Sequence, residues 1–401
     1  MFEPRAEALG MLSHKNFLSP EGDTLESLLG RLTAQTSEMV DCLRQLVELE
    51  SPSQNKAALD RLGRHLAAQF ANLGGEIRFH KQESAGDHLQ VHFAGSGKPI
   101  LFLGHMDTVW DLGTLATMPF RVAKGRAFGP GIFDMKAGIA QAIFAIRALQ
   151  ELNGRLPRAL TVLLVTDEEI GSRSSRPITE ALAKKSAGAL VLEPAQGPKG
   201  ALKTSRKGVG GYLLKVEGRE AHSGLDPDKG ASAVLELARQ LLVIEKFGDG
   251  KRGITVNPGV VRGGTRSNVI AGEATAEVDA RISRLQDIPR LDKKFHSLRP
   301  FDKRCKVAVS GGIGRPPLER TAKVAALFKL ARGLACELGF ALEEASVGGG
   351  SDGNFTAALG IPTLDGLGAV GEGAHARHES VVIAEMPRRA ALLARLIETV
   401  R

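Results

Sequence analysis

Hydrophobic residues recur along the chain with two different spacings, which predict alternating helices and strands. Residues 25–50 and 55–73 carry apolar side chains at helical spacing, and a further helix is predicted over residues 136–152. Short apolar or alternating runs between and after these helices are typical of strands. The predicted strands of this part span residues 76–80, 88–93, 99–104, 159–166 and 187–192. Strands interleaved with helices indicate an α/β layer architecture.

The pattern changes near residue 205. The following residues predict the order strand, helix, strand, strand, helix, strand, which is that of a ferredoxin-like open sandwich. These elements are expected over residues 212–217, 231–244, 255–261, 274–282, 285–298 and 306–310. Helices at 321–338 and 385–400 then resume the first pattern. We therefore predict a catalytic domain formed by residues 1–205 and 314–401, interrupted by an inserted domain of residues 206–313.

Composition limits the classes of protein and partner. The chain has 401 residues, more than one hydrophobic core usually supports, so we expect two domains. Hydrophobic residues make up 43% of the chain, as in ordinary globular proteins. Its apolar runs are shorter than the roughly 20 residues that a membrane helix needs. The net charge is +8, but the basic residues are scattered, and the chain has one Trp and one Tyr for stacking on bases, although 16 Phe are present; we expect no nucleic-acid partner. An anionic small substrate fits this charge as well.

Cysteine usage and the N-terminus bear on the compartment. The three cysteines lie far apart without CxxC spacing, which argues against a disulfide framework and against a cysteine zinc site. Residues 1–20 mix charged and apolar residues and lack the continuous apolar stretch of a secretory signal. We therefore expect a cytoplasmic protein without a membrane partner.

Histidine and acidic residues follow the predicted strands of the first domain, where open α/β sheets place their sites. His105 and Asp107 come directly after a strand, and a His two residues before an Asp can use the carboxylate to orient its ring for a metal. Asp134 follows a glycine-bearing stretch, where it would either lie in the site or cap the next helix. Glu193 ends the last of these strands.

Three adjacent carboxylates, Asp167, Glu168 and Glu169, follow the strand of residues 159–166. They repel one another, so a buried position is costly unless cations neutralise them; a solvated turn is the alternative. His375 lies in a histidine-bearing segment near the C-terminus. Together these motifs supply two histidines and three carboxylates, which suits two zinc ions with one further carboxylate left free as a base.

Six motifs occur here in the order in which they occur in one enzyme family. They are GHMDTV, GPGIFDMK, TDEEIGSRSSR, EGREAHSG, SNVI and GGGSDGNFTAALGIPTLDGLG. In these motifs the chain resembles the aminoacylase and glutamate carboxypeptidase family of co-catalytic zinc peptidases, and within it the glutamate carboxypeptidase branch. The resemblance runs from about residue 51 to residue 395. It implies a mixed-sheet α/β zinc-peptidase catalytic domain with an inserted ferredoxin-like α+β dimerisation domain, and a homodimer.

The resemblance also implies a metal set. His105 and Glu193 would bind one zinc ion, Glu169 and His375 the other, and Asp134 would bridge the two. Members of the family have a cis peptide bond after the bridging Asp, so we expect one between residues 134 and 135.

Two further residues of the first domain gain roles from the resemblance. Glu168 would be the general acid/base, and Asp107 would orient the zinc-binding histidine. His375 matches the family's C-terminal histidine better than His378 does, because it precedes Glu379 by four residues.

The inserted domain carries residues expected to bind substrate. His222 resembles the family histidine that reaches the active site of the partner subunit and polarises the scissile carbonyl; a buried structural histidine is the alternative. Asn268, Arg281 and Arg315 resemble residues that bind the substrate carboxylate or the oxyanion, and the planar fork of arginine suits a carboxylate. For Arg315 a surface charge in a hinge loop is the alternative.

The resemblance implies a small acyl-amino acid or peptide substrate. Its amide bond would be hydrolysed with two zinc ions per subunit, releasing a C-terminal glutamate or a similar amino acid. Deacylases and desuccinylases of the same family are an alternative, because their metal sets are similar. A catalytically inactive metal-binding protein is an alternative of another class, although an unliganded base beside the metals argues against it.

Overall fold

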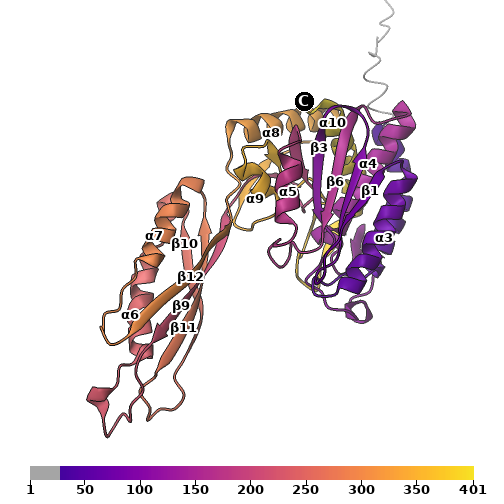
Figure 1. The fold of residues 1–401 in the computed structure, drawn as a ribbon. Coiled ribbons are helices and arrows are strands. Elements are labelled where there is room, and N and C mark those ends of the chain that lie inside the picture. The colour runs from indigo at the N-terminus through magenta and orange to yellow at the C-terminus, as the bar shows by residue number, and fades with distance from the viewer. Residues whose placement is uncertain (1–27) are drawn as a thin grey trace, which may run out of the picture.

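Residues 28–401, the part that this computed structural model describes, are built around a six-stranded sheet and the four-stranded sheet of the inserted segment (Figure 1). The helix predicted over residues 25–50 begins outside this part; within it, helical residues 28–34 precede α2 (Thr36–Glu48). The expectation about a secretory signal concerns residues that also lie outside it. Among residues 28–401, no helix is both long enough and apolar enough to cross a membrane.

The larger sheet is mixed. Its strands run in the order β1-β2-β6-β3-β7-β14; β2 is antiparallel to its neighbours, whereas β6, β3, β7 and β14 are parallel. Their bounds are β1 (Glu76–His80), β2 (His88–Phe93), β3 (Ser96–His105), β6 (Arg158–Val165), β7 (Gly188–Val191) and β14 (Thr363–Leu364). Because β3, β6 and β7 are parallel, the segments that follow them leave the sheet at the same edge.

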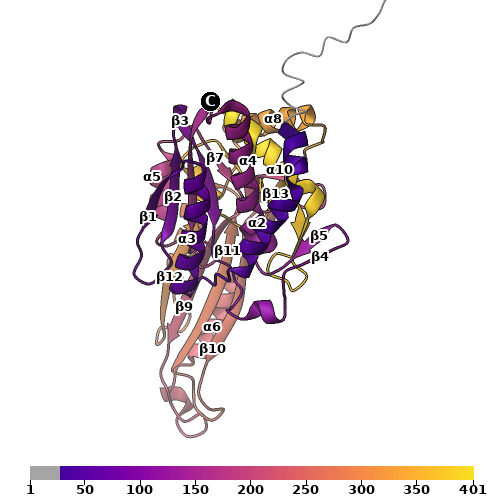
Figure 2. The same cartoon turned by 90° about the vertical axis from the view of Figure 1, so that its right-hand side faces the viewer.

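Helices cover both faces of this sheet (Figures 1 and 2). Along β3 the side chains alternate: Ile100 and Phe102 join the core that includes α3, α4 and α10, whereas Leu101 and Leu103 pack with α5. Such burial on both faces explains why the strands appear in the sequence as continuous apolar runs. The helices are α3 (Lys56–Asn72), α4 (Ala137–Asn153), α5 (Arg176–Ala183), α8 (Ala322–Glu337), α9 (Gly353–Ala358) and α10 (Met386–Thr399).

Short strands outside the main sheet join segments that are distant in the sequence. One pair is parallel, β8 with β13, and a second set runs in the order β15-β16-β5-β4. Their bounds are β4 (Arg121–Ala123), β5 (Arg126–Phe128), β8 (Leu202–Arg206), β13 (Glu344–Val347), β15 (Gly371–Glu372) and β16 (Ser380–Val382). Pairing of β16 with β5 brings the residues that precede β16 close to those that follow β5.

The inserted segment has the predicted ferredoxin-like order. Its sheet runs β10-β11-β9-β12, all antiparallel, and its core includes Tyr212 of the sheet and Phe295 of a helix, whose rings stack. The bounds are β9 (Gly208–Glu217), α6 (Ala233–Glu245), β10 (Thr255–Gly263), β11 (Glu273–Ile282), α7 (Ile288–His296) and β12 (Lys306–Arg315). The expected fold class is confirmed, while the division of the chain at residues 205 and 313 stays a prediction.

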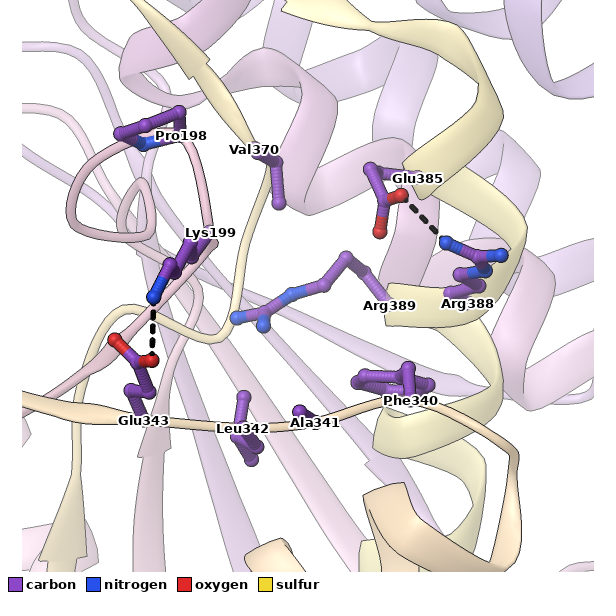
Figure 3. Close-up of a pocket in the computed structure, with 10 residues that line it drawn as sticks. All are labelled: Pro198, Lys199, Phe340, Ala341, Leu342, Glu343, Val370, Glu385, Arg388 and Arg389. Atoms are coloured by element: carbon purple, nitrogen blue, oxygen red, sulfur yellow. Dashed lines mark hydrogen bonds and ion pairs between the residues drawn. The ribbon is translucent and has the colours of Figure 1, made fainter.

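A buried arginine ties the C-terminal helix to the loop after β14. Arg389 of α10, labelled in Figure 3, is 2% exposed. It donates hydrogen bonds to the backbone oxygens of Gly200, Gly366 and Gly368. Burial lowers the pKa of this guanidinium to about 10. The amide of Gly368 in turn donates to the backbone oxygen of Glu193, at 2.9 Å. Arg389 therefore supports the segment that carries one of the predicted metal ligands.

The neighbouring arginines of α10 provide a matched test of this tether. We expect Arg389→Gln to lower the free energy of unfolding by about 3 kcal/mol, because a shorter amide leaves buried carbonyls without donors. Arg388→Gln should change it by less than about 0.5 kcal/mol, because Arg388 is half exposed and its ion pair with Glu385 lies at the surface. Urea unfolding of both variants checks this, and equal losses would contradict the tether.

Candidate metal centre

Two groups of ligand-type side chains lie together beyond the carboxyl edge of the larger sheet and share one residue. His105, Asp134 and Glu193 form the first group, and Asp134, Glu169 and His375 form the second. Within each group, one ligand atom of each residue lies within 4.8 Å of the others. The structure thus gathers the five residues that were expected to hold metal ions, although the chain separates them widely.

Asp134 lies between the two histidines. Its Oδ1 is 3.1 Å from Nε2 of His105, and its Oδ2 is 3.5 Å from Nε2 of His375. Glu193 lies on the His105 side, with 3.7 Å between Oε1 and Nε2, and Glu169 lies on the His375 side at 3.2 Å. The peptide bond between residues 134 and 135 is cis, as expected.

Burial sets the electrostatics of the carboxylates. It raises the pKa of Glu168 well above its usual range and also raises the pKa of Glu193, although Arg315 and Arg206 act in the opposite direction. Carboxylates in such a place stay ionised only if further cations face them.

The neighbouring carboxylates raise the pKa values of the two histidines. Burial disfavours protonation of His105, but hydrogen bonding with Asp107 and Asp134 outweighs it and raises the pKa of the ring well above its usual range. Hydrogen bonds with Asp134 and Glu169 raise the pKa of His375 to about 10. Two imidazoles and three carboxylates that attract positive charge so strongly fit a pair of divalent cations.

Asp107 contacts both His105 and the loop that carries Glu168 and Glu169. Nδ1 of His105 lies 2.9 Å from the backbone oxygen of Asp107 and 3.6 Å from its carboxylate. The carboxylate accepts hydrogen bonds from the amides of Glu168 and Glu169 and from the hydroxyl of Ser53. Asp107, which was expected to orient His105, is thus closer to the ring through its backbone oxygen than through its carboxylate. The carboxylate instead binds the amides of the loop that carries Glu168 and Glu169.

The three adjacent acids point to three different partners. Asp167 accepts hydrogen bonds from Ser174, Glu168 pairs with Arg315 at 3.1 Å, and Glu169 faces His375. They are buried or partly buried instead of forming the solvated turn of the alternative. Of these acids, Glu168 precedes the ligand-type Glu169 in the chain, interacts electrostatically with Glu193 and His105, and belongs to neither ligand group.

Arg315 is 9% exposed, so the alternative of a surface charge in a hinge loop is wrong. It pairs with Asp352 at 2.8 Å and with Glu168, and it donates to the hydroxyl of Ser172 at 2.9 Å. In the sequence, Asp352 and Ser172 lie within motifs that carry the family resemblance, but neither had a role of its own assigned to it.

His222 and Asn268 lie close to each other but not at the centre. The amide of Ser223 donates to the backbone oxygen of Asn268, and Nδ1 of His222 accepts from the amides of Gly224 and Leu225. Their loops, after β9 and before β11, lie at the end of the insertion that is remote from the larger sheet (Figure 1). His222 is exposed, so a buried structural histidine is excluded.

Arg281 lies at the other end of the inserted sheet. It is opposite Val209 in the register of β11 with β9, and its guanidinium pairs with Asp279 at 3.0 Å. It is therefore close along the sheet to Arg315, which is also opposite Val209, on the other side of β9.

Glu379 is a buried residue whose part in the site the sequence did not reveal beyond its spacing from His375. Its carboxylate accepts hydrogen bonds from the amides of Gly131, Phe133 and Asp134, at 2.8 to 3.0 Å, and from the indole of Trp110. It thereby holds the loop that presents Asp134.

Comparison with known proteins places this chain among hydrolases. Residues 101–399 match the model of Peptidase family M20/M25/M40. Carboxypeptidase G2 of Pseudomonas sp. (strain RS-16) is 31% identical over 378 residues, which cover 91% of this chain and 90% of that protein. Acetylornithine deacetylase of Myxococcus xanthus is 31% identical over 327 residues, covering 76% of this chain and 81% of that protein.

Solved structures share the fold. Aminopeptidase PepT from Bacillus cereus ATCC 10987 superposes with a TM-score of 0.74 at 23% identity, covering 91% of this chain and 98% of its own. The YXEP protein of Bacillus subtilis, a dinuclear metal binding peptidase, has a TM-score of 0.67 at 14% identity, covering 92% and 99%. Given the family match over most of its length and the 31% identity to a carboxypeptidase, this chain belongs to peptidase family M20/M25/M40.

Proposed function

We propose that this protein is a dinuclear zinc metallopeptidase that releases a C-terminal glutamate from N-acyl or peptide substrates by hydrolysing an amide bond. One observation carries the proposal: two ligand groups share Asp134, and Glu168, which interacts electrostatically with Glu193 and His105, belongs to neither group. The similarity to carboxypeptidase G2 over 91% of the chain supports a carboxypeptidase reaction. The preference for glutamate rests on the sequence motifs that resemble the glutamate carboxypeptidase branch.

The two ligand groups support a proposed set of metal-binding residues. We assign one zinc ion to His105 and Glu193 and the other to Glu169 and His375, with Asp134 between them. Imidazole and carboxylate are ligands that zinc accepts in catalytic sites. Zinc ions held there would polarise the scissile carbonyl and lower the pKa of a water molecule that attacks it.

Glu168 is the proposed general acid/base. Its carboxylate would accept a proton from the attacking water and later donate it to the nitrogen of the leaving amine. Burial raises the pKa of Glu168, which brings the group closer to the pH at which it can both take and give a proton. Arg315, at 3.1 Å, opposes this rise and holds the carboxylate in place.

Substrate binding would use two subunits. Arg315 lies beside Glu168 in the same chain, and we propose that it receives a substrate carboxylate, helped by Arg281. His222 and Asn268 lie at the remote end of the insertion, so we propose that a homodimer brings them to the centre of the partner subunit. There the free ring nitrogen of His222 would stabilise the oxyanion. A cytoplasmic location, without nucleic-acid or membrane partners, remains our expectation.

A deacylase or desuccinylase is the second candidate. The similarity to acetylornithine deacetylase favours it, and so does the similarity to succinyl-diaminopimelate desuccinylase of Dechloromonas aromatica, which is 26% identical over 76% of this chain. Both candidate reactions hydrolyse an amide at the same centre, so they differ in which part of the substrate is recognised.

The role of Glu168 can be separated from that of the ligands. We expect Glu168→Ala to retain two zinc ions per chain and to lower kcat by about 10²–10⁴-fold, because the variant removes the proton carrier and no ligand. Turnover and metal content measured on the same sample check this. Glu180→Ala, which removes a carboxylate that pairs with Arg176 on α5, is the control and should leave both unchanged. Full activity of Glu168→Ala, or loss of its zinc, would remove Glu168 from this role.

Substrate preference distinguishes the two candidate reactions. We expect kcat/KM for an N-acyl-glutamate to exceed that for the matching N-acyl-glutamine and N-acyl-alanine by about tenfold or more, because an arginine pairs more strongly with a second carboxylate than with an amide or a methyl group. Initial rates over a range of substrate concentrations provide the ratio. Equal values for the three compounds would refute the glutamate preference and favour the deacylase.

A further inference from the structure

Arg206, the last residue of β8, lies buried directly behind the metal centre. Its Nε and Nη2 donate to the two carboxylate oxygens of Asp365, at 2.9 and 2.7 Å. Its Nη2 also donates to Oε2 of Glu193 at 2.9 Å, and its Nη1 donates to the backbone oxygens of Gly350 and Gly349. All three nitrogens of the guanidinium are therefore engaged with acceptors of the chain itself.

In this arrangement the two carboxylate oxygens of Glu193 have different partners. Oε2 accepts a hydrogen bond from Arg206, whereas Oε1 faces the centre, 3.7 Å from Nε2 of His105. Only Oε1 is then available to a metal ion. Glu169 in the second ligand group contacts His375 rather than an arginine. The two groups thus differ in the restraint on their glutamate.

The position of Arg206 is itself firmly set. Its side chain is 4% exposed and that of Asp365 is fully buried, so the pair cannot separate without leaving charges unpaired in the interior. Asp365 also accepts a hydrogen bond from the hydroxyl of Ser351. A bidentate pair fixes the plane of the guanidinium as well as its distance. Arg206 is therefore a rigid support for Glu193.

We propose that Arg206 is a positioning residue that holds Glu193 as a one-oxygen ligand and thereby determines the affinity of the His105–Glu193 metal site separately from that of the Glu169–His375 site. The inference rests on the proposed function in one respect, namely that the centre holds two ions. Outer hydrogen-bond partners of metal ligands typically change metal affinity by 10–100-fold when they are removed. Arg206 occupies such a place for one of the two sites.

Arg206→Lys tests this in the full-length protein. Lysine keeps the positive charge beside Asp365 but lacks the fork that reaches Glu193 at the same time. We expect the variant to bind two Zn²⁺ ions, one with affinity lowered by about 10–100-fold and the other within about threefold of wild type. Competition with a chromophoric chelator yields the two dissociation constants, and thermal unfolding of the metal-free proteins reports whether the fold is intact.

Two further variants keep the test decisive. Asp365→Asn removes one charge of the buried pair, leaves every ligand in place, and should weaken the same single site. Arg252→Lys alters the ion pair with the buried Asp287 in the inserted domain and should leave both affinities unchanged. If Arg206→Lys does not fold, the Asp365→Asn result decides.

The outcomes separate this inference from the proposed function. Unchanged or tighter binding at both sites in Arg206→Lys and Asp365→Asn, or equal weakening of both sites, would overturn the positioning role while leaving a two-zinc enzyme intact. Wild-type protein that binds no zinc would overturn the proposed function instead.

Discussion

Negative charge buried at the carboxyl edge of the larger sheet is the constraint on which the rest of the site depends. Asp134, Glu168, Glu169 and Glu193 lie close together there with little access to water. Isolated ions in such a place are destabilised by several kcal/mol each, so the fold must supply positive charge. Two buried arginines meet part of this need, and the side chains that remain face one another in the geometry of metal ligands.

Two of the acids outside the ligand groups, Asp107 and Glu379, hold backbone segments in place. Asp107 accepts from the amides of the loop that carries Glu168 and Glu169, and Glu379 accepts from the amides of the loop that carries Asp134. Each of these carboxylates therefore fixes the main chain that presents a ligand rather than the ligand itself. Arg206 acts differently, because it contacts the carboxylate of a ligand directly. The centre is thus supported both through the main chain and through side chains.

Much of this site could be predicted from the sequence, for a definite reason. Parallel strands end at one edge, so polar residues that follow apolar runs converge there, as His105, Glu169 and Glu193 do. The ferredoxin-like order of the insertion could also be predicted, although the glycines at the start of β9 and the end of β12 concealed how far those strands extend.

The supporting contacts could not be predicted. Strands of two or three residues such as β15 and β16 leave no periodic signal, yet they place His375. The four consecutive polar residues that end β8 suggest an exposed segment, whereas Arg206 at its end is buried. The partners of Asp107 and Arg315 depend on distances between segments that no local pattern encodes. The proposed action of His222 in a partner subunit requires a second copy of the chain, which a single sequence does not place.

A crystal structure of the protein purified with zinc, with anomalous differences recorded on both sides of the zinc absorption edge, tests the central claim most directly. The account predicts two zinc peaks in each chain, one among His105, Asp134 and Glu193 and one among Asp134, Glu169 and His375. A single peak, peaks outside these residues, or none at all would contradict it.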